Sequence, residues 1–242
     1  MSVVHFVYES SFILLHDVTI YNTYRHSGSL FSSTCSATAR EYGVLYWSAT
    51  INQVVVGCIL LDLDPIQLII RAIVLLVAMT VHEFAHVYVA YLMGDTTGAD
   101  RGKLTLNPLV HINPIGYLMG VLIGFGFLGS APINPGRMRN PRWGYLAAVA
   151  AGPASNLLLA VIFAIPVRLF PTIFLGSAFL AQLISTMIYL NIILALFNII
   201  PLFPLDGWSI AYSLLPPEQA RWWQANQQNS YYVFMGLILL SL

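Results

Sequence analysis

The stretch "TVHEFAHVYVA", residues 80–90, places two histidines and a glutamate inside a long run of aliphatic residues. This run extends over residues 65–93, begins with a proline and is followed by Gly94, a pattern that predicts one continuous helix. At about 1.5 Å per residue, such a helix is long enough to cross roughly 30 Å of hydrocarbon. Ionisable side chains are costly in hydrocarbon, so these three residues need a partner that stabilises them.

The composition indicates that this helix lies in a lipid bilayer. Of the 242 residues, 58% are hydrophobic and only 8% are charged, and the mean hydropathy is +0.75. A soluble domain usually carries about a quarter charged residues. The formal net charge is zero and no basic run is present, so nothing in the sequence favours a nucleic-acid partner.

Two further apolar runs, residues 144–170 and 172–200, have the length of membrane-spanning helices. The last apolar segment, residues 231–242, is too short to span alone, so it is either anchored at the interface or cut short. No internal repeat is apparent. The sequence therefore predicts an all-α polytopic membrane protein with a core of three transmembrane helices and additional terminal segments.

A charge-free, glycine-rich segment, residues 112–136, could be mistaken for a fourth span. Its glycines lie between prolines and weaken a continuous helix. Basic residues, which gather on the cytoplasmic side of membranes, flank it at both ends: Arg101, Lys103, Arg137, Arg139 and Arg142. If both flanks face the cytosol, the segment is a membrane-embedded re-entrant hairpin or a small sheet beside a site. A simple fourth helix is the alternative.

The same charge pattern predicts an orientation for the three spans. The first would run from the outside to the cytosol, the second back out past Arg168, and the third inward, leaving Arg221 in the cytosol. The layout suits a multi-pass protein of a bacterial or archaeal cytoplasmic membrane with its site toward the cytosol. Residues 1–60 are expected to be an atypical, poorly ordered or misassigned leader, residues 61–216 the core, and residues 217–242 a tail.

The three polar residues of the opening stretch have the spacing of a metal site. Positions four apart on a helix share a face, so His82 and His86 can offer imidazole nitrogens to one ion. H-E-x-x-H is the zincin arrangement, in which Glu83 takes a proton from the attacking water. The alternative is a set of buried polar groups that join helices or conduct protons.

A catalytic zinc site needs a third protein ligand and one open position. The candidates beyond the first helix are Asp95, Asp100, His111 and Asp206. Asp206 is the strongest, because prolines in "NIIPLFPLDGW" break the preceding helix and a glycine lets the chain turn after the carboxylate. An ordinary helix-ending turn would be the simpler explanation if the H-E-x-x-H helix were absent.

Four stretches together resemble one known family, the site-2 protease family of intramembrane zinc metalloproteases. They are "HEFAH" at 82–86, "LNPLVHINPIG" at 106–116, "AGPASN" at 151–156 and "NIIPLFPLDG" at 198–207. The resemblance covers roughly residues 65–216 in the order of a short family form that lacks PDZ and CBS domains.

The resemblance implies a single zinc ion per chain, held by His82, His86 and Asp206, with Glu83 as general base. It also implies that Asn198 holds the substrate carbonyl or its developing oxyanion. A preorganised donor of this kind contributes about 3 kcal/mol to lowering a barrier.

Three other residues of the matching stretches receive a structural interpretation. Asn156 is expected to be a packing contact, because Gly152 and Ala154 allow helices to approach closely and the amide can bridge them. His111 is expected to be structural as well. The loop reads "HINP" where many relatives read "HIDP", so a charged role at Asn113 is in doubt.

The predicted function is hydrolysis of peptide bonds in membrane-protein substrates within or near the bilayer, as in regulated intramembrane proteolysis. The predicted partner is a membrane protein with a transmembrane segment, and homo-oligomerisation is left open. A helical substrate must unwind, and the glycine-rich segment around Gly124 and Gly126 is predicted to offer an edge for strand addition. A membrane metal or proton transporter and a catalytically inactive scaffold are the alternatives.

Overall fold

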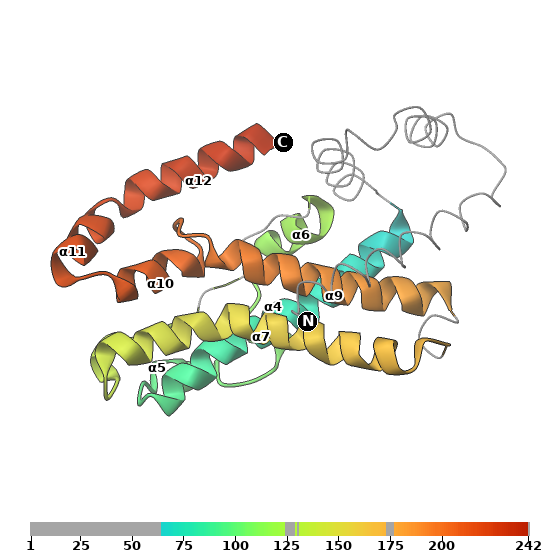
Figure 1. Cartoon of the computed structure of the whole chain (residues 1–242), viewed down its shortest axis with the longest axis horizontal. Helices are drawn as coiled ribbons and strands as arrows, with labels where there is room; N and C mark the ends of the chain where they lie inside the picture. Colours follow the sequence, from blue (N-terminus) through green and yellow to red (C-terminus); the bar gives the residue numbers. More distant parts are fainter. Residues whose placement is uncertain (1–63, 124–128, 130, 173–176, 242) are drawn as a thin grey trace. The chain divides into compact units, whose positions relative to one another are not determined.

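The computed structural model describes residues 64–123, 129, 131–172 and 177–241. The expectation about the leader lies outside these residues. The described part contains helices and no strand. Three of its helices are long and apolar enough to cross a membrane. Figure 1 shows these three, α4, α7 and α9, running side by side.

The first spanning helix, α4, is Pro65–Leu92, which confirms the predicted start and ends one residue earlier than predicted. Its start is set by Asp64, whose side chain accepts a hydrogen bond from the Ile66 N–H at 3.1 Å, and by the proline in the first turn. The chain leaves the helix through Gly94, which has a positive φ of 105° that favours glycine.

The other two spans confirm the predicted helices with shifted starts. Helix α7, Pro141–Leu169, begins three residues earlier than predicted, because the side chain of Asn140 accepts a hydrogen bond from the Trp143 N–H and a proline follows it. Helix α9, Ala178–Ile199, begins later than predicted. Residues 173–176 lie outside the described part.

Small clusters of buried side chains join the three spans. Ile70 and Val74 of α4 pack with Met187 of α9. Near the other end of α4, Ala90 packs with Met138 and Ala148. Many outward apolar side chains stay exposed. In lipid these can be solvated by acyl chains, so close packing and interhelical hydrogen bonds must hold the bundle together.

The glycine-rich segment begins with a short helix, α6, Pro114–Ile123. Its ten residues extend only about 15 Å, too little to span a bilayer. Tyr117 anchors it to α4 through a 2.6 Å hydrogen bond to the Ala72 carbonyl. At its other end the buried Arg71 of α4 donates to the Val121 carbonyl at 3.0 Å.

The two ends of this segment meet again. A Cβ atom added to Gly129 would overlap the carbonyl oxygen of His111, so the backbone at Gly129 lies directly against the loop that precedes α6. The two described ends of the segment therefore lie in contact, which fits the predicted re-entrant hairpin better than a fourth span. Gly124 and Gly126, on which the strand-addition hypothesis depends, lie outside the described residues.

Asn113 directly precedes α6, and its role there is one that both asparagine and the acidic residue of many relatives can fill. Its side-chain oxygen accepts from the backbone N–H groups of Ile115 and Gly116 at 3.0 and 3.1 Å. This is an N-cap interaction, which an amide oxygen satisfies as well as a carboxylate does.

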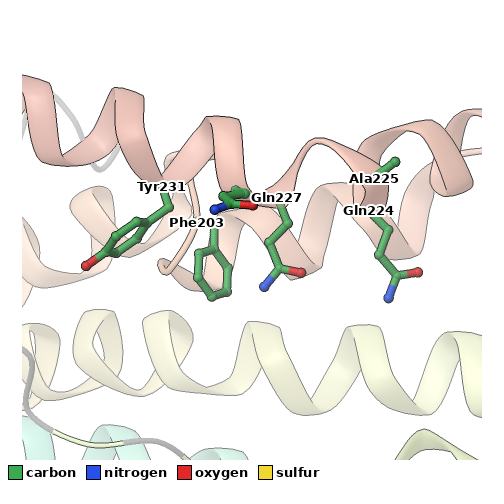
Figure 2. Close-up of a pocket in the computed structure, with 6 residues that line it drawn as sticks. Phe203, Gln224, Ala225, Gln227 and Tyr231 are labelled. Atoms are coloured by element: carbon green, nitrogen blue, oxygen red, sulfur yellow. The ribbon is translucent and has the colours of Figure 1, made fainter.

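Three shorter helices follow α9: α10 Asp206–Leu214, α11 Pro217–Ala225 and α12 Gln227–Ser241. The stacked rings of Trp208 and Trp223, 4.3 Å between centroids, join α10 to α11. A groove of about 420 Å³ lies beside α11 and α12 and contains none of the predicted site residues. Figure 2 shows its lining, which consists of Phe203, Gln224, Ala225, Gln227, Gln228 and Tyr231.

Candidate metal centre

The structure brings His82, His86 and Asp206 together. The two histidines lie one turn apart on α4, and their Nε2 atoms are 3.0 Å from each other. The Oδ2 atom of Asp206 is 3.1 Å from Nε2 of His82 and 3.3 Å from Nε2 of His86. Ligand atoms about 2.0–2.1 Å from a tetrahedral zinc ion are roughly 3.3 Å apart. The three separations therefore fit one shared ion.

The hydrogen bonds behind the imidazoles point their lone pairs at the same position. Nδ1 of His82 lies 2.6 Å from the side-chain oxygen of Asn156, and Nδ1 of His86 lies 2.8 Å from the carbonyl oxygen of Ala148. Both partners only accept hydrogen bonds, so each Nδ1 carries the proton and each Nε2 carries a lone pair.

This arrangement leaves electron-rich atoms facing each other in a buried place. Both histidines are buried, and within the described part of the chain the Oδ2 atom of Asp206 has no hydrogen-bond partner. Two lone pairs and a carboxylate oxygen at such distances repel one another unless a cation lies between them. The donor set, two imidazoles and one carboxylate, is one that zinc uses in hydrolytic sites.

Asp206 reaches the centre from a helix start. It is the first residue of α10, and a Cβ atom added to Gly207 would overlap the carbonyl oxygens of Ile199 and Ile200. Only glycine allows α10 to begin this close to the end of α9. Burial opposes ionisation of the Asp206 carboxyl, and a cation held between this carboxyl and the two imidazole nitrogens would favour the ionised form. Asp206 would then be an anionic ligand.

Arg142 holds the far end of the same short helix. Its guanidinium donates to the carbonyl oxygens of Ser213, Leu214 and Leu215 at 2.9, 3.0 and 3.3 Å. These are unpaired carbonyls at the C-terminus of α10, where a cation also complements the helix dipole. Since Arg142 belongs to α7, this contact fixes α10 against the helix that also contacts both histidines.

A glycine of α7 makes room for the two imidazoles. A Cβ atom on Gly152 would overlap Nε2 and Cε1 of His86 and would lie 2.7 Å from Cε1 of His82. The α7 backbone thus lies directly against the metal-facing side of the histidines. The sequence analysis treats this glycine as a helix-packing residue. Its second role, leaving room for the imidazoles, depends on a contact between α4 and α7, which are distant in sequence.

Glu83, the predicted general base, follows His82 directly on α4. It is buried, and its Oε2 atom has no hydrogen-bond partner among the described residues. Its carboxyl carbon is 3.6 Å from the position of a Cβ atom on Gly129, so the returning end of the hairpin passes next to it. A buried carboxylate oxygen without a hydrogen-bond partner is free to accept a proton from a reactant.

The remaining candidate site residues make hydrogen bonds or ion pairs with other parts of the chain. Asn198 donates from its side chain to the Leu194 carbonyl at 2.9 Å, so its proposed contact with substrate stays a prediction. Asp95 accepts from the Asn134 backbone N–H at 2.6 Å. Asp100 pairs with Arg137 at 2.8 Å. His111 bonds to the Thr105 carbonyl at 2.7 Å.

Asn156 has a role that the sequence interpretation missed. It does bridge helices, as expected, but its oxygen also orients a metal-facing histidine. The "GPASN" stretch contained a signal for it: an amide one turn after a glycine on an apolar helix. Nothing in that stretch names His82 as the partner, because 74 positions separate the two residues.

Fold and site together define a polytopic membrane protein with a zincin-type helix. The carboxylate of Asp206 is the candidate for the third metal ligand. Comparison with known proteins agrees. The chain is 40% identical over 176 residues to "Putative zinc metalloprotease YwhC" of Bacillus subtilis, covering 70% of this chain and 80% of the relative. It is 33% identical to "Putative zinc metalloprotease Rip2" of Mycolicibacterium smegmatis, covering 60% of this chain and 57% of the relative.

The Rip2 protein of Mycobacterium tuberculosis is 31% identical over the same proportions of the two chains. No family model and no solved structure matches the chain. On the strength of these relatives and the motifs above, the chain belongs to the site-2 protease family of zinc metalloproteases. The names of the relatives support a metalloprotease role for it.

Proposed function

We propose that the protein is a zinc endopeptidase that hydrolyses peptide bonds of membrane-protein substrates within or near the bilayer. The observation that carries the proposal is that His82 and His86 of the spanning helix α4 and Asp206 of α10 bring ligand atoms within 3.3 Å of one another, beside a Glu83 whose Oε2 atom has no hydrogen-bond partner among the described residues. His82, His86 and Asp206 would hold the zinc ion. The ion, when bound, supplies a Lewis acid that activates water and polarises a carbonyl.

Each protein residue has a distinct task in this reaction. Glu83 accepts a proton from the attacking water and returns it to the amine nitrogen that leaves when the C–N bond breaks. The Asn156 and Ala148 oxygens hold the imidazoles in the required orientation. Asn198 is proposed to donate its remaining amide N–H to the substrate carbonyl, which requires the substrate to lie along the end of α9.

The proposed orientation places the centre toward the cytosol of a bacterial or archaeal cell. The support is the distribution of basic residues. Those near the C-terminal end of α4 and the N-terminal end of α7 gather in one region, where Arg137 pairs with Asp100 and the Arg139 N–H donates to the Met93 carbonyl. By the positive-inside rule this end faces the cytosol. His86 is six residues from the end of α4, about 9 Å.

Cleavage of a membrane-tethered reporter by the purified protein tests the proposal. The unmodified protein is expected to cleave the reporter and contain one zinc per chain. Glu83→Gln should keep its zinc and lose activity by a factor of about 100 to 10,000, because only the proton acceptor is removed. Asp206→Ala should lose both zinc and activity. Glu218→Gln, an exposed glutamate on α11, is the matched control and should behave like the unmodified protein.

Two results would count against the proposal. Full cleavage by Glu83→Gln would remove the general base from the mechanism. Zinc binding without cleavage of any reporter by the unmodified protein would instead favour a metal transporter or an inactive scaffold, which metal flux into vesicles would separate.

A further inference from the structure

A row of buried amide groups connects α9 to the metal centre. It runs from Asn191 on α9, through Asn156 on α7, to His82 on α4, and both asparagines are completely buried. Buried amides must be hydrogen-bonded, and each has a donor end and an acceptor end. Their partners therefore decide which way each amide points.

The orientation of Asn191 is fixed by Met187, one turn earlier on α9. One end of the Asn191 amide lies 2.8 Å from the Met187 carbonyl oxygen and 3.3 Å from its sulfur. Both of these atoms only accept hydrogen bonds, so the NH₂ group must face them. The opposite end, the Asn191 oxygen, is thereby presented to α7.

The orientation of Asn156 follows from that of Asn191. The Asn191 oxygen lies 2.8 Å from one end of the Asn156 amide, and the Ala78 carbonyl oxygen lies 3.4 Å from the same end. Both are acceptors, so this end is the NH₂ group. The Asn156 oxygen then faces Nδ1 of His82 at 2.6 Å and requires a proton on that nitrogen.

The two histidines differ in how firmly their protons are placed. His86 bonds to a backbone carbonyl of Ala148, which cannot turn around. His82 depends on a side-chain amide that would present NH₂ after a half rotation. A rotated Asn156 would move the His82 proton to Nε2, the atom that faces His86 and Asp206, and would block metal binding there.

We propose that Asn191 is a positioning residue of the metal centre: by fixing the Asn156 amide, it keeps the proton of His82 on Nδ1 and the Nε2 lone pair directed at the ion. This inference rests on the proposed function. It gives α9, which contributes no predicted metal ligand, a part in metal binding. Outer partners of metal-bound histidines typically change metal affinity by 10- to 100-fold.

The test is a double-mutant cycle on metal affinity, measured by competition between the full-length protein and a chromophoric Co²⁺ chelator. Asn191→Leu should weaken Co²⁺ binding by about 10-fold. Asn156→Asp presents oxygen at both ends, so it needs no neighbour to orient it. In that background Asn191→Leu should cause no further loss, a coupling that a merely structural role of Asn191 would not produce.

Ser185→Ala is the matched control, because this serine also lies on α9 and donates to a carbonyl one turn earlier, at 2.7 Å. It should leave Co²⁺ affinity unchanged. Asn191→Ala, which adds no bulk, serves as the companion variant if the leucine variant does not fold.

The outcomes separate the inference from the proposed function. Absence of stoichiometric Co²⁺ binding by the unmodified protein would overturn both. Normal binding by the unmodified protein with unchanged affinity in both Asn191 variants, or with an equal loss in the two Asn156 backgrounds, would overturn the inference alone.

Discussion

The two sides of the metal centre are built in different ways. His82 and His86 come from the middle of one long helix, and their common face follows from helical periodicity. Asp206 comes from the start of a short helix that follows a broken stretch of chain, and its place depends on contacts with α7 and α9. The histidine side is determined by local helix geometry, and the carboxylate side is determined by tertiary packing. Substitutions that affect only one side can show how much each contributes to metal binding.

Among the residues that only position the predicted ligands, the largest effect is expected at Gly152, which packs against both histidines. Gly152→Ala should lower zinc affinity and reporter cleavage by more than about 100-fold, because the added methyl group displaces the imidazoles. Helix stability cannot explain such a loss, since alanine is the better helix former by about 1 kcal/mol. Zinc content and cleavage rate are the measurements.

Gly236→Ala on α12 is the control for this substitution, because a Cβ atom there meets nothing within 4 Å. It should leave zinc content and cleavage unchanged. If Gly152→Ala cleaves as fast as the control, α7 does not lie against the imidazoles as described.

The carboxylate side is tested at Gly207. Gly207→Ala should push the start of α10 away from the carbonyls of Ile199 and Ile200 and move Asp206 with it. Zinc affinity should fall by about 10- to 100-fold, less than for Gly152→Ala, because the histidine pair remains intact. Zinc competition titrations of both variants give the ranking. A smaller loss in Gly152→Ala than in Gly207→Ala would reverse the comparison.

Much of the histidine side could be predicted from the sequence, and little of the carboxylate side could. The H-E-x-x-H spacing predicts a shared face, and the proline and glycine at its ends predict the bounds of α4. Asp206 was favoured among several acids on chain breaks and on family resemblance. The contacts that place it, those of Arg142 and Gly207, join segments whose proximity no local pattern encodes.

The lack of a local signal for long-range contacts also explains which other roles the sequence analysis did not predict. Asn113 was recognised as a departure, but its capping role needs the start of α6 to be known. Asn156 was expected to pack, and its contact with His82 connects helices far apart in sequence. The contact between the two ends of the glycine-rich segment could be predicted, because the distribution of charges constrains both ends at once.

A weaker effect on the carboxylate side is expected at Arg142. Arg142→Ala removes the hydrogen bonds to the last carbonyls of α10. Because this side chain is exposed, the loss of unfolding free energy should be only about 1 kcal/mol. Zinc affinity should fall by a few-fold, since Asp206 stays attached to a loosened helix. The measurements are thermal unfolding in detergent and zinc competition.

Arg139→Ala controls for the loss of one positive charge in the same region, because the Arg139 side chain lies at Gly94 and not at α10. Equal zinc affinities in the two arginine variants would show that Arg142 does not position Asp206.

The smallest effect is expected away from the centre, at Asp95. Burial opposes its ionisation, but hydrogen bonds from the Asn134 and Thr97 N–H groups and the Thr97 hydroxyl lower its pKa below the usual value. A carboxyl with a lowered folded-state pKa stabilises the protein above its unfolded pKa, about 3.9, and this contribution is lost as the pH falls through the folded value.

Asp95→Asn should therefore lower the melting temperature by a few degrees at pH 7. The difference from the unmodified protein should shrink as the pH falls below about 4. Zinc content at pH 7 should not change. A difference in melting temperature that grows toward low pH would have the wrong sign for this explanation.

X-ray absorption at the zinc edge of the purified, unmodified protein tests the metal centre most directly. The predicted spectrum contains nitrogen and oxygen neighbours at about 2.0–2.1 Å and the outer-shell scattering of two imidazoles. These would be the rings of His82 and His86, with an oxygen from Asp206. A spectrum with sulfur neighbours or without imidazole scattering, or a protein that retains no zinc, would contradict the shared site.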